Sequence, residues 1–153
     1  MTGRGVNPYW YKFPGFTPNP NVGISTEFRR LAKFMGWEGY KRDEEKIEAY
    51  GSEIEFHWGR DDHNKLTGLK DICNELGVAG NLTTITQMVK ALKAHHINVV
   101  NLINHRRNPN LPIIRFPTRK AFVKYTGKPG NTCPKEAAKR VAWVKVLLEV
   151  LER

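Results

Sequence analysis

The sequence predicts an all-α fold: a compact orthogonal bundle of five to seven helices that follows an extended N-terminal arm rich in aromatic residues and proline. Apolar residues recur at helical spacing along most of the chain, and capping residues or glycines flank several of these segments. A chain of 153 residues with 40% apolar and 26% charged residues can fold as one globular domain. We therefore expect an arm at residues 1–24 and a single helical domain at residues 25–153.

The arm covers residues 6–24, where four prolines exclude a continuous helix. Its aromatic side chains could stack on nucleic-acid bases or pack on the helical domain, and we favour packing because it buries apolar area. These side chains are Tyr9, Trp10, Tyr11, Phe13 and Phe16.

The first two helices are predicted from apolar spacing. Phe28, Leu31 and Met35 share one helical face, so a helix should begin near residues 25–26 and stop at Gly36. A second helix should span about residues 38–56, with Tyr40 on its buried stripe. Its outer face should be acidic and carry Glu44, Glu45, Glu48, Glu53 and Glu55.

Local capping signals define the middle of the chain. Residues 66–76 form a third helix closed by Gly77, and Thr84 with Gln87 fits a capping box that starts a fourth. Residues 97–103 are either a helix capped at Asn98 or a buried strand, and the spacing of the apolar residues favours the helix.

The last third should hold two more helices. Residues 113–116 are expected to be extended, and Thr118 should cap a short helix that runs through Tyr125. In that helix Ala121, Phe122 and Tyr125 should face inward, and Arg119, Lys120 and Lys124 outward. After a loop at 127–130, a final helix should start at Pro134, with Ala137, Val141, Val144, Leu148 and Leu151 on its apolar face.

Charge is distributed unevenly along the chain. Residues 1–76 contain eleven Lys or Arg and twelve Asp or Glu, a balance of −1, whereas residues 77–153 contain fourteen and three, a balance of +11. The 60 residues between Glu75 and Glu136 hold no acid at all but ten Lys or Arg. An acid-free block of this length is typical of a surface for a negatively charged partner.

The leading hypothesis is therefore a non-catalytic protein that binds a polyanion, and nucleic acid, either DNA or RNA, is the favoured partner. If about 4–6 phosphates are contacted, the logarithmic salt slope on duplex DNA should be about −4 to −5. The candidate residues are Lys90, Lys93, Arg106, Arg107, Arg115, Arg119, Lys120, Lys124 and Lys128. A helix-turn-helix made of residues 69–76 and 84–94 is a weaker version, because its connection is longer than usual.

An alternative is a protein-interaction module in which the acidic second helix and the basic half meet complementary surfaces, including those of a second copy. Charge pairing inside one monomer would account for the same pattern.

No catalytic, cofactor or metal site is predicted. His57, Asp61, Asp62 and His63 form the only candidate for a divalent cation, and their spacing does not place two histidines on one helix face. No glycine-rich phosphate loop or nucleophile elbow is present. Cys73 lies among apolar residues and should be a reduced core thiol. No secretory signal or membrane span is visible, so we expect an intracellular protein, nuclear or cytoplasmic.

Two phrases, EFRRLAKFMGW at 27–37 and ITQMVKALKAHHINVVNLI at 85–103, resemble a family of small basic proteins from filamentous ascomycete fungi. Residues 116–125 and 133–148 resemble the C-terminal part of that family, so the resemblance spans about residues 16–150. It implies a fungal, intracellular context and no activity. The family has no established biochemical role, so it assigns no functional residue.

Overall fold

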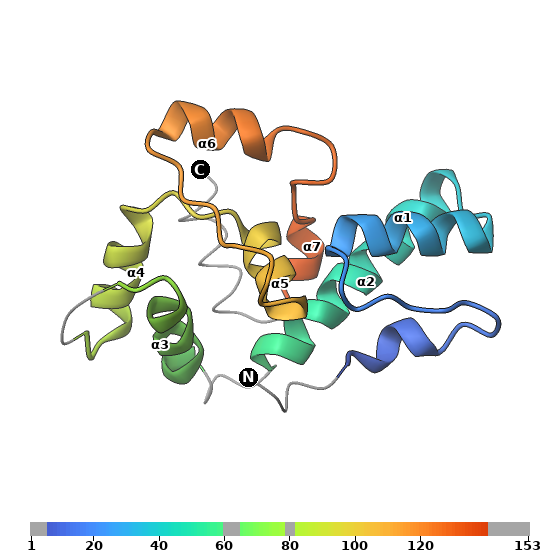
Figure 1. Ribbon diagram of the computed structural model, residues 1–153, viewed down its shortest axis with the longest axis horizontal. Coiled ribbons are helices and arrows are strands. Elements are labelled where there is room, and N and C mark those ends of the chain that lie inside the picture. The colour runs from blue at the N-terminus through green and yellow to red at the C-terminus, as the bar shows by residue number, and fades with distance from the viewer. Residues whose placement is uncertain (1–5, 60–64, 79–81, 141–153) are drawn as a thin grey trace.

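Eight helical segments occupy the residues that the computed structural model describes, which are 6–59, 65–78 and 82–140 (Figure 1). No strand occurs among these residues, and the only β-type pairing there is an isolated antiparallel bridge between Ile97 and Arg115. The all-α prediction is confirmed. The segments are the 3-10 helix η1 (Pro8–Tyr11) and the α-helices α1 (Ile24–Met35), α2 (Gly39–Trp58), α3 (Lys65–Glu75), α4 (Ile85–Lys93), α5 (Val99–Arg107), α6 (Arg119–Thr126) and α7 (Lys135–Ala138).

Helix α2 is central to the packing. It packs against α1, α5, α7 and η1, whereas α3 and α4 pack against each other beside this group (Figure 1). The last helix is described only to Ala138, so the predicted face from Val141 to Leu151 lies outside the described residues. None of the described helices is long and apolar enough to cross a bilayer.

The predicted ends of α1 and the start of α2 are confirmed, with one difference in α2. Gly36 closes α1 at a φ of 71°, in the left-handed region that glycine adopts without strain. Tyr40, predicted to be on the buried stripe of α2, is 88% exposed. The buried residues of α2 begin only at Ala49.

The local signals in α4 and α5 are also confirmed. The Thr84 side chain accepts a hydrogen bond from the backbone N–H of Gln87, and the Gln87 side chain accepts one from the backbone N–H of Thr84. Residues 99–107 are helical, as favoured, and the Asn98 side chain caps them by accepting from the N–H of Asn101 at 3.0 Å.

Asn98 does more than cap α5, and its replacement gives a first testable prediction. It is fully buried, and its amide donates to the Thr126 hydroxyl at 3.0 Å and to the Asn131 carbonyl at 2.9 Å. Asn98→Ala should lower the free energy of unfolding by about 2 kcal/mol, because it removes the cap and strands buried polar partners.

Urea unfolding measures this change, and Thr84→Ala is the matched control. Thr84 caps α4 at an exposed position, so its loss should cost about 1 kcal/mol. Equal losses in the two variants would contradict the view that Asn98 ties α5 to the end of α6.

The N-terminal arm packs on the helical domain, as favoured over a stacking role. Tyr9 and Trp10 are buried, and Phe13 and Phe16 are partly buried against the core. Tyr11 is the exception among the five predicted aromatic side chains, because it is 53% exposed. The arm is not extended throughout, because residues 8–11 form the single 3-10 turn η1 after Asn7, whose side chain accepts from the N–H of Tyr9. A proline at the first position of this turn presets its φ angle.

Both cysteines are buried and lie outside any disulfide, and the prediction of a reduced core thiol at Cys73 is confirmed. Burial raises the pKa of the Cys73 thiol. A buried thiol of raised pKa is a poor nucleophile, so Cys73 serves as a small apolar side chain.

Candidate nucleic-acid interface

Helix α6 lies at the edge of the molecule, apart from the central group of helices (Figure 1). Phe122 is its one fully buried side chain, and it contacts the rings of Phe116 and His96 at centroid distances of 5.7 and 6.0 Å. Phe116 also contacts the Tyr125 ring at 4.9 Å. This aromatic group holds the inner face of α6, as its apolar spacing predicted, and leaves the outer face to solvent.

Five cations are exposed on α6 and the segments that flank it. None of the five forms an ion pair with a carboxylate in the described part of the chain, so their charge is available to solvent. We call this group the α6 basic strip, and it consists of Arg115, Arg119, Lys120, Lys124 and Lys128.

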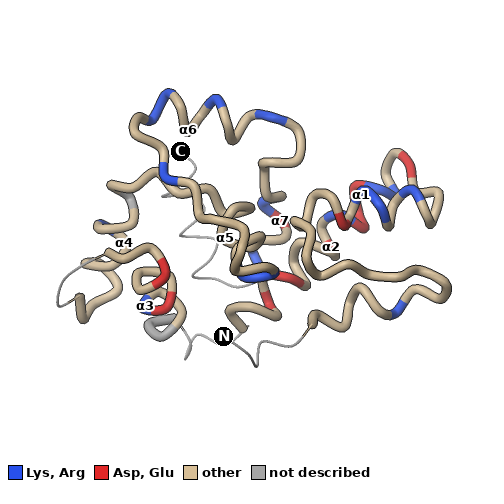
Figure 2. Tube along the Cα trace, in the orientation of Figure 1, with Lys and Arg blue, Asp and Glu red and all other residues tan. Residues whose placement is uncertain are grey.

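The surroundings of the strip reinforce its charge. Figure 2 shows Lys and Arg along α6 with no Asp or Glu on it, whereas the acidic positions of the described residues lie on α1, α2, α3 and α7 and at Glu38 between α1 and α2. A row of cations without interspersed carboxylates produces a positive potential that extends about a Debye length, roughly 8 Å at physiological salt.

Arg106 and Arg107 do not belong to this surface. Arg106 forms an ion pair with Glu75 at 2.6 Å and is 9% exposed. Arg107 is 5% exposed and forms an ion pair with Glu53 at 3.2 Å. Both side chains were predicted to contact nucleic acid, and the structure instead places them in intramolecular ion pairs.

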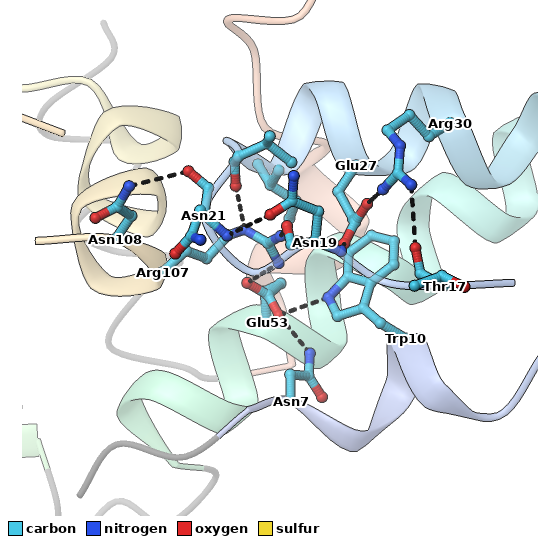
Figure 3. Close-up of polar contacts among 12 residues, drawn as sticks. Asn7, Trp10, Thr17, Asn19, Asn21, Glu27, Arg30, Glu53, Arg107 and Asn108 are labelled. Carbon is cyan, nitrogen blue, oxygen red and sulfur yellow. Dashed lines mark hydrogen bonds and ion pairs between the residues drawn. The ribbon is translucent and has the colours of Figure 1, made fainter. Parts of the chain in front are cut away.

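Arg107 lies at the centre of a buried polar network (Figure 3). Its Nε donates to the Val22 carbonyl at 2.9 Å and one terminal nitrogen donates to the Asn19 carbonyl at 3.2 Å, so it fastens the arm to α5. Glu53 also accepts from the side chains of Asn7, at 2.5 Å, and Trp10, at 2.9 Å. The network explains why this arginine is unavailable to a ligand.

The remaining candidates lie on α4. Lys90 is exposed, and the side chain of Lys93 lies outside the described part of the structure. Gln87, a possible base-reading residue in the helix-turn-helix version, accepts from the N–H groups of Thr83 and Thr84 at 3.0 and 3.2 Å. Because this amide serves the cap and Asp71 is exposed on the neighbouring α3, no observation favours α4 as a recognition helix.

Most of the acidic side chains predicted on the outer face of α2 form ion pairs within the chain. Glu53 was predicted to be on the surface but is 1% exposed and pairs with Arg107. Glu45 pairs with Lys41, and both Glu48 and Glu55 pair with Arg140. Ion pairs within the monomer thus involve four of the five acids on which the protein-interaction alternative depended, and the fifth, Glu44, is exposed.

No group of three or more His, Cys, Asp or Glu suitable for a metal ion occurs among the described residues. Residues 61–63 of the candidate cation site lie outside the described residues. His57, its fourth member, has its Nε2 3.3 Å from a Glu53 carboxylate oxygen.

Comparisons with known proteins add no assignment. No family model matches the chain, and no curated protein or solved structure matches it. The candidate interface therefore depends on the geometry and charge of this chain alone.

Sequence reasoning missed a second group of cations, formed by Arg29, Arg42 and Lys46, which line one pocket. They belong to the half of the chain whose balance is −1, so net charge did not reveal them. The only available signal was the four-residue spacing of Arg42 and Lys46, which places both on one face of a helix.

Proposed function

We propose that this protein binds nucleic acid by contacting the phosphate backbone with the α6 basic strip. The observation that carries the proposal is that five exposed cations lie on one short helix and its flanks while the chain from residue 76 to residue 135 contains no acid. The partner class is a polyanion with regularly spaced charge. No catalytic step forms part of the proposal.

The spacing of the strip suits a linear row of phosphates. Lys120 and Lys124 are four residues apart, which is about 6 Å along a helix axis, close to the rise of two nucleotides in one strand. Arg115 and Lys128 extend the strip beyond both ends of α6. The aromatic side chains of this region, Phe116 and Tyr125, are partly buried against α6, so base stacking is not their primary role.

Backbone contact without base readout should give weak sequence preference and strong salt dependence. With all five cations engaged on duplex DNA, the plot of log K against log salt concentration should have a slope of about −4.5. This value lies within the range expected from the sequence, although Arg106 and Arg107 no longer contribute to it.

Fluorescence anisotropy with labelled duplex DNA, single-stranded DNA and RNA, each at several salt concentrations, tests the proposal. The variant Lys120→Glu/Lys124→Glu should abolish measurable binding near physiological salt. The milder Lys120→Gln/Lys124→Gln should make the slope shallower by about 1.8, because two phosphate contacts are lost.

The matched control is Lys33→Glu/Lys70→Glu, which changes net charge by the same amount at two exposed positions on α1 and α3. It should retain most of the affinity. If it loses as much as Lys120→Glu/Lys124→Glu, binding follows total charge and the α6 basic strip is not the site. The proposal would be refuted if the parent protein bound none of the three nucleic acids at low salt.

A further inference from the structure

A pocket of about 430 Å³ lies between the first turns of α1, the first half of α2 and the loop at residues 129–130. This volume is within the range of pockets that hold small organic ligands, roughly 300–1,000 Å³. The pocket is separate from the α6 basic strip, although Lys128 directly precedes the loop that forms one of its sides.

Three cations line this pocket, Arg29 from α1 and Arg42 and Lys46 from α2, and no carboxylate lines it. None of the three forms an ion pair within the described part of the chain. Three like charges around one cavity repel one another, and the proximity of a multiply charged anion would relieve that repulsion.

Aromatic rings, in place of acids, hold two of these cations. The Arg42 guanidinium lies over the Phe28 ring at 5.2 Å, and the Lys46 ammonium lies over the Tyr50 ring at 5.5 Å. A ring face attracts a cation without neutralising it. The arrangement therefore orients the charged groups at the pocket and leaves their N–H donors available for a ligand.

Neutral donors complete the lining. Ser25 lies in the first turn of α1, at the positive end of the helix dipole. Burial and, secondly, Cys133 raise the pKa of Tyr50 to about 12, while Ser25, Arg42 and Arg29 act in the opposite direction. The Tyr50 hydroxyl therefore keeps its proton at neutral pH, and its hydrogen bond with Ser25 uses one of the two hydroxyl protons.

The loop at 129–130 approaches α1 closely enough to require glycine. Gly130 has a φ of 86°, and a Cβ at this position would lie 2.5 Å from the Ser25 hydroxyl oxygen. Because any other side chain would be strained and would clash there, glycine is what allows this loop to close one side of the pocket.

From this geometry we propose that the pocket binds the phosphate group of a small phosphorylated organic molecule. A phosphate monoester is a dianion with several acceptor oxygens, which matches three cations and the one hydroxyl donor that the Ser25 and Tyr50 pair leaves available. One phosphate would fill only part of the cavity, so the Phe28 ring and the remaining space are left for the organic part of the ligand. This site is independent of nucleic-acid binding by α6.

Isothermal titration calorimetry with inorganic phosphate, adenosine 5′-monophosphate and adenosine, at constant ionic strength in chloride, tests the proposal. The two phosphate compounds should bind with one molecule per chain, the nucleotide more tightly than inorganic phosphate, and adenosine should not bind. Arg42→Gln/Lys46→Gln should weaken nucleotide binding at least about tenfold, or about 1.4 kcal/mol. The control Lys33→Gln/Lys70→Gln, at two exposed positions outside both proposed sites, should bind the nucleotide as the parent protein does.

The single variant Arg42→Lys keeps the positive charge at this position. It should bind the nucleotide more tightly than Arg42→Gln/Lys46→Gln does. If Arg42→Gln/Lys46→Gln does not fold, as judged by circular dichroism, Lys46→Gln alone should still weaken nucleotide binding.

Equal affinity in the parent protein and the pocket variant, or no binding of either phosphate compound at millimolar concentration, would overturn the proposal. Binding of inorganic phosphate without the nucleotide would overturn the assignment to an organic phosphate. Failure of the α6 variants to affect nucleic-acid binding would leave this site unaffected, because the two sets of variants do not overlap.

Discussion

Arg107→Ala should lower the free energy of unfolding by about 3–5 kcal/mol, the loss typical when one partner of a buried ion pair is removed. Arg107 is 5% exposed and lies beside two buried carboxylates, Glu53 at 3.2 Å and Glu27 at 3.5 Å. The alanine variant would leave both negative charges without this partner and the Val22 and Asn19 carbonyls without their donor. Because a small domain is stable by only about 5–15 kcal/mol, this is a large fraction of the total.

Urea unfolding followed by circular dichroism measures the effect, and two variants separate its causes. Arg107→Lys keeps the charge but lacks the planar fork that reaches both the carboxylate and the arm carbonyls, so its loss should be intermediate. In Arg107→Met/Glu53→Gln both charges are removed, and the double variant should lose less stability than the sum of the two single variants. A loss below about 1 kcal/mol for Arg107→Ala, in the range of surface substitutions, would contradict the role we assign to the network.

The contrast between Arg107 and Lys124 shows what the sequence could and could not predict. The outward face of α6 was predicted correctly because Thr118, Phe122 and Tyr125 act within a few residues of one another. The environment of Arg107 depends on Glu53, 54 positions away in the sequence. Two adjacent arginines at a helix end look like a surface cluster when only neighbouring residues are considered.

The same limit applies to the arm and to the phosphate pocket. The arm was expected to pack, because burying aromatic area is favourable, but its attachment through the amide of Asn7 and the backbone around Asn19 has no local signature. The pocket combines Arg29 from α1, Arg42 from α2 and Gly130 from a loop. Helix ends and buried faces can be predicted from apolar periodicity and capping residues, which are local in the sequence. Sites assembled from distant segments cannot be predicted in this way, because they depend on the tertiary packing.

Acid should destabilise the protein through Glu53. Burial alone would raise the pKa of this carboxyl, but the hydrogen bond with His57 and the charge of Arg107 outweigh it and lower the pKa from 4.5 to about 2. Since the folded-state pKa lies below the unfolded-state value, the contribution of Glu53 to stability is fully present above about pH 4.5. It is lost progressively as the pH falls toward 2.

The expected size of this loss follows from the shift. A lowering of the pKa from 4.5 to about 2 corresponds to a loss of stability on the order of a few kcal/mol when the carboxylate is protonated. Urea unfolding of the parent protein and of Glu53→Gln at several pH values from 6 to 2.5 isolates the contribution of Glu53 to stability, because both proteins contain all the other carboxyl groups. Glu53→Gln should be less stable at pH 6, since it leaves Arg107 without its closest carboxylate.

The difference in stability between the two proteins should then shrink as the pH falls, because protonation of Glu53 in the parent removes the same charge that the variant lacks. Parallel curves of unfolding free energy against pH would show that folding does not lower the pKa of Glu53. That result would also remove the reason for regarding the Glu53 and Arg107 pair as the polar anchor of the arm. Convergence of the curves would establish the pair as a buried, ionised contact that stabilises the native state only while the carboxylate is charged.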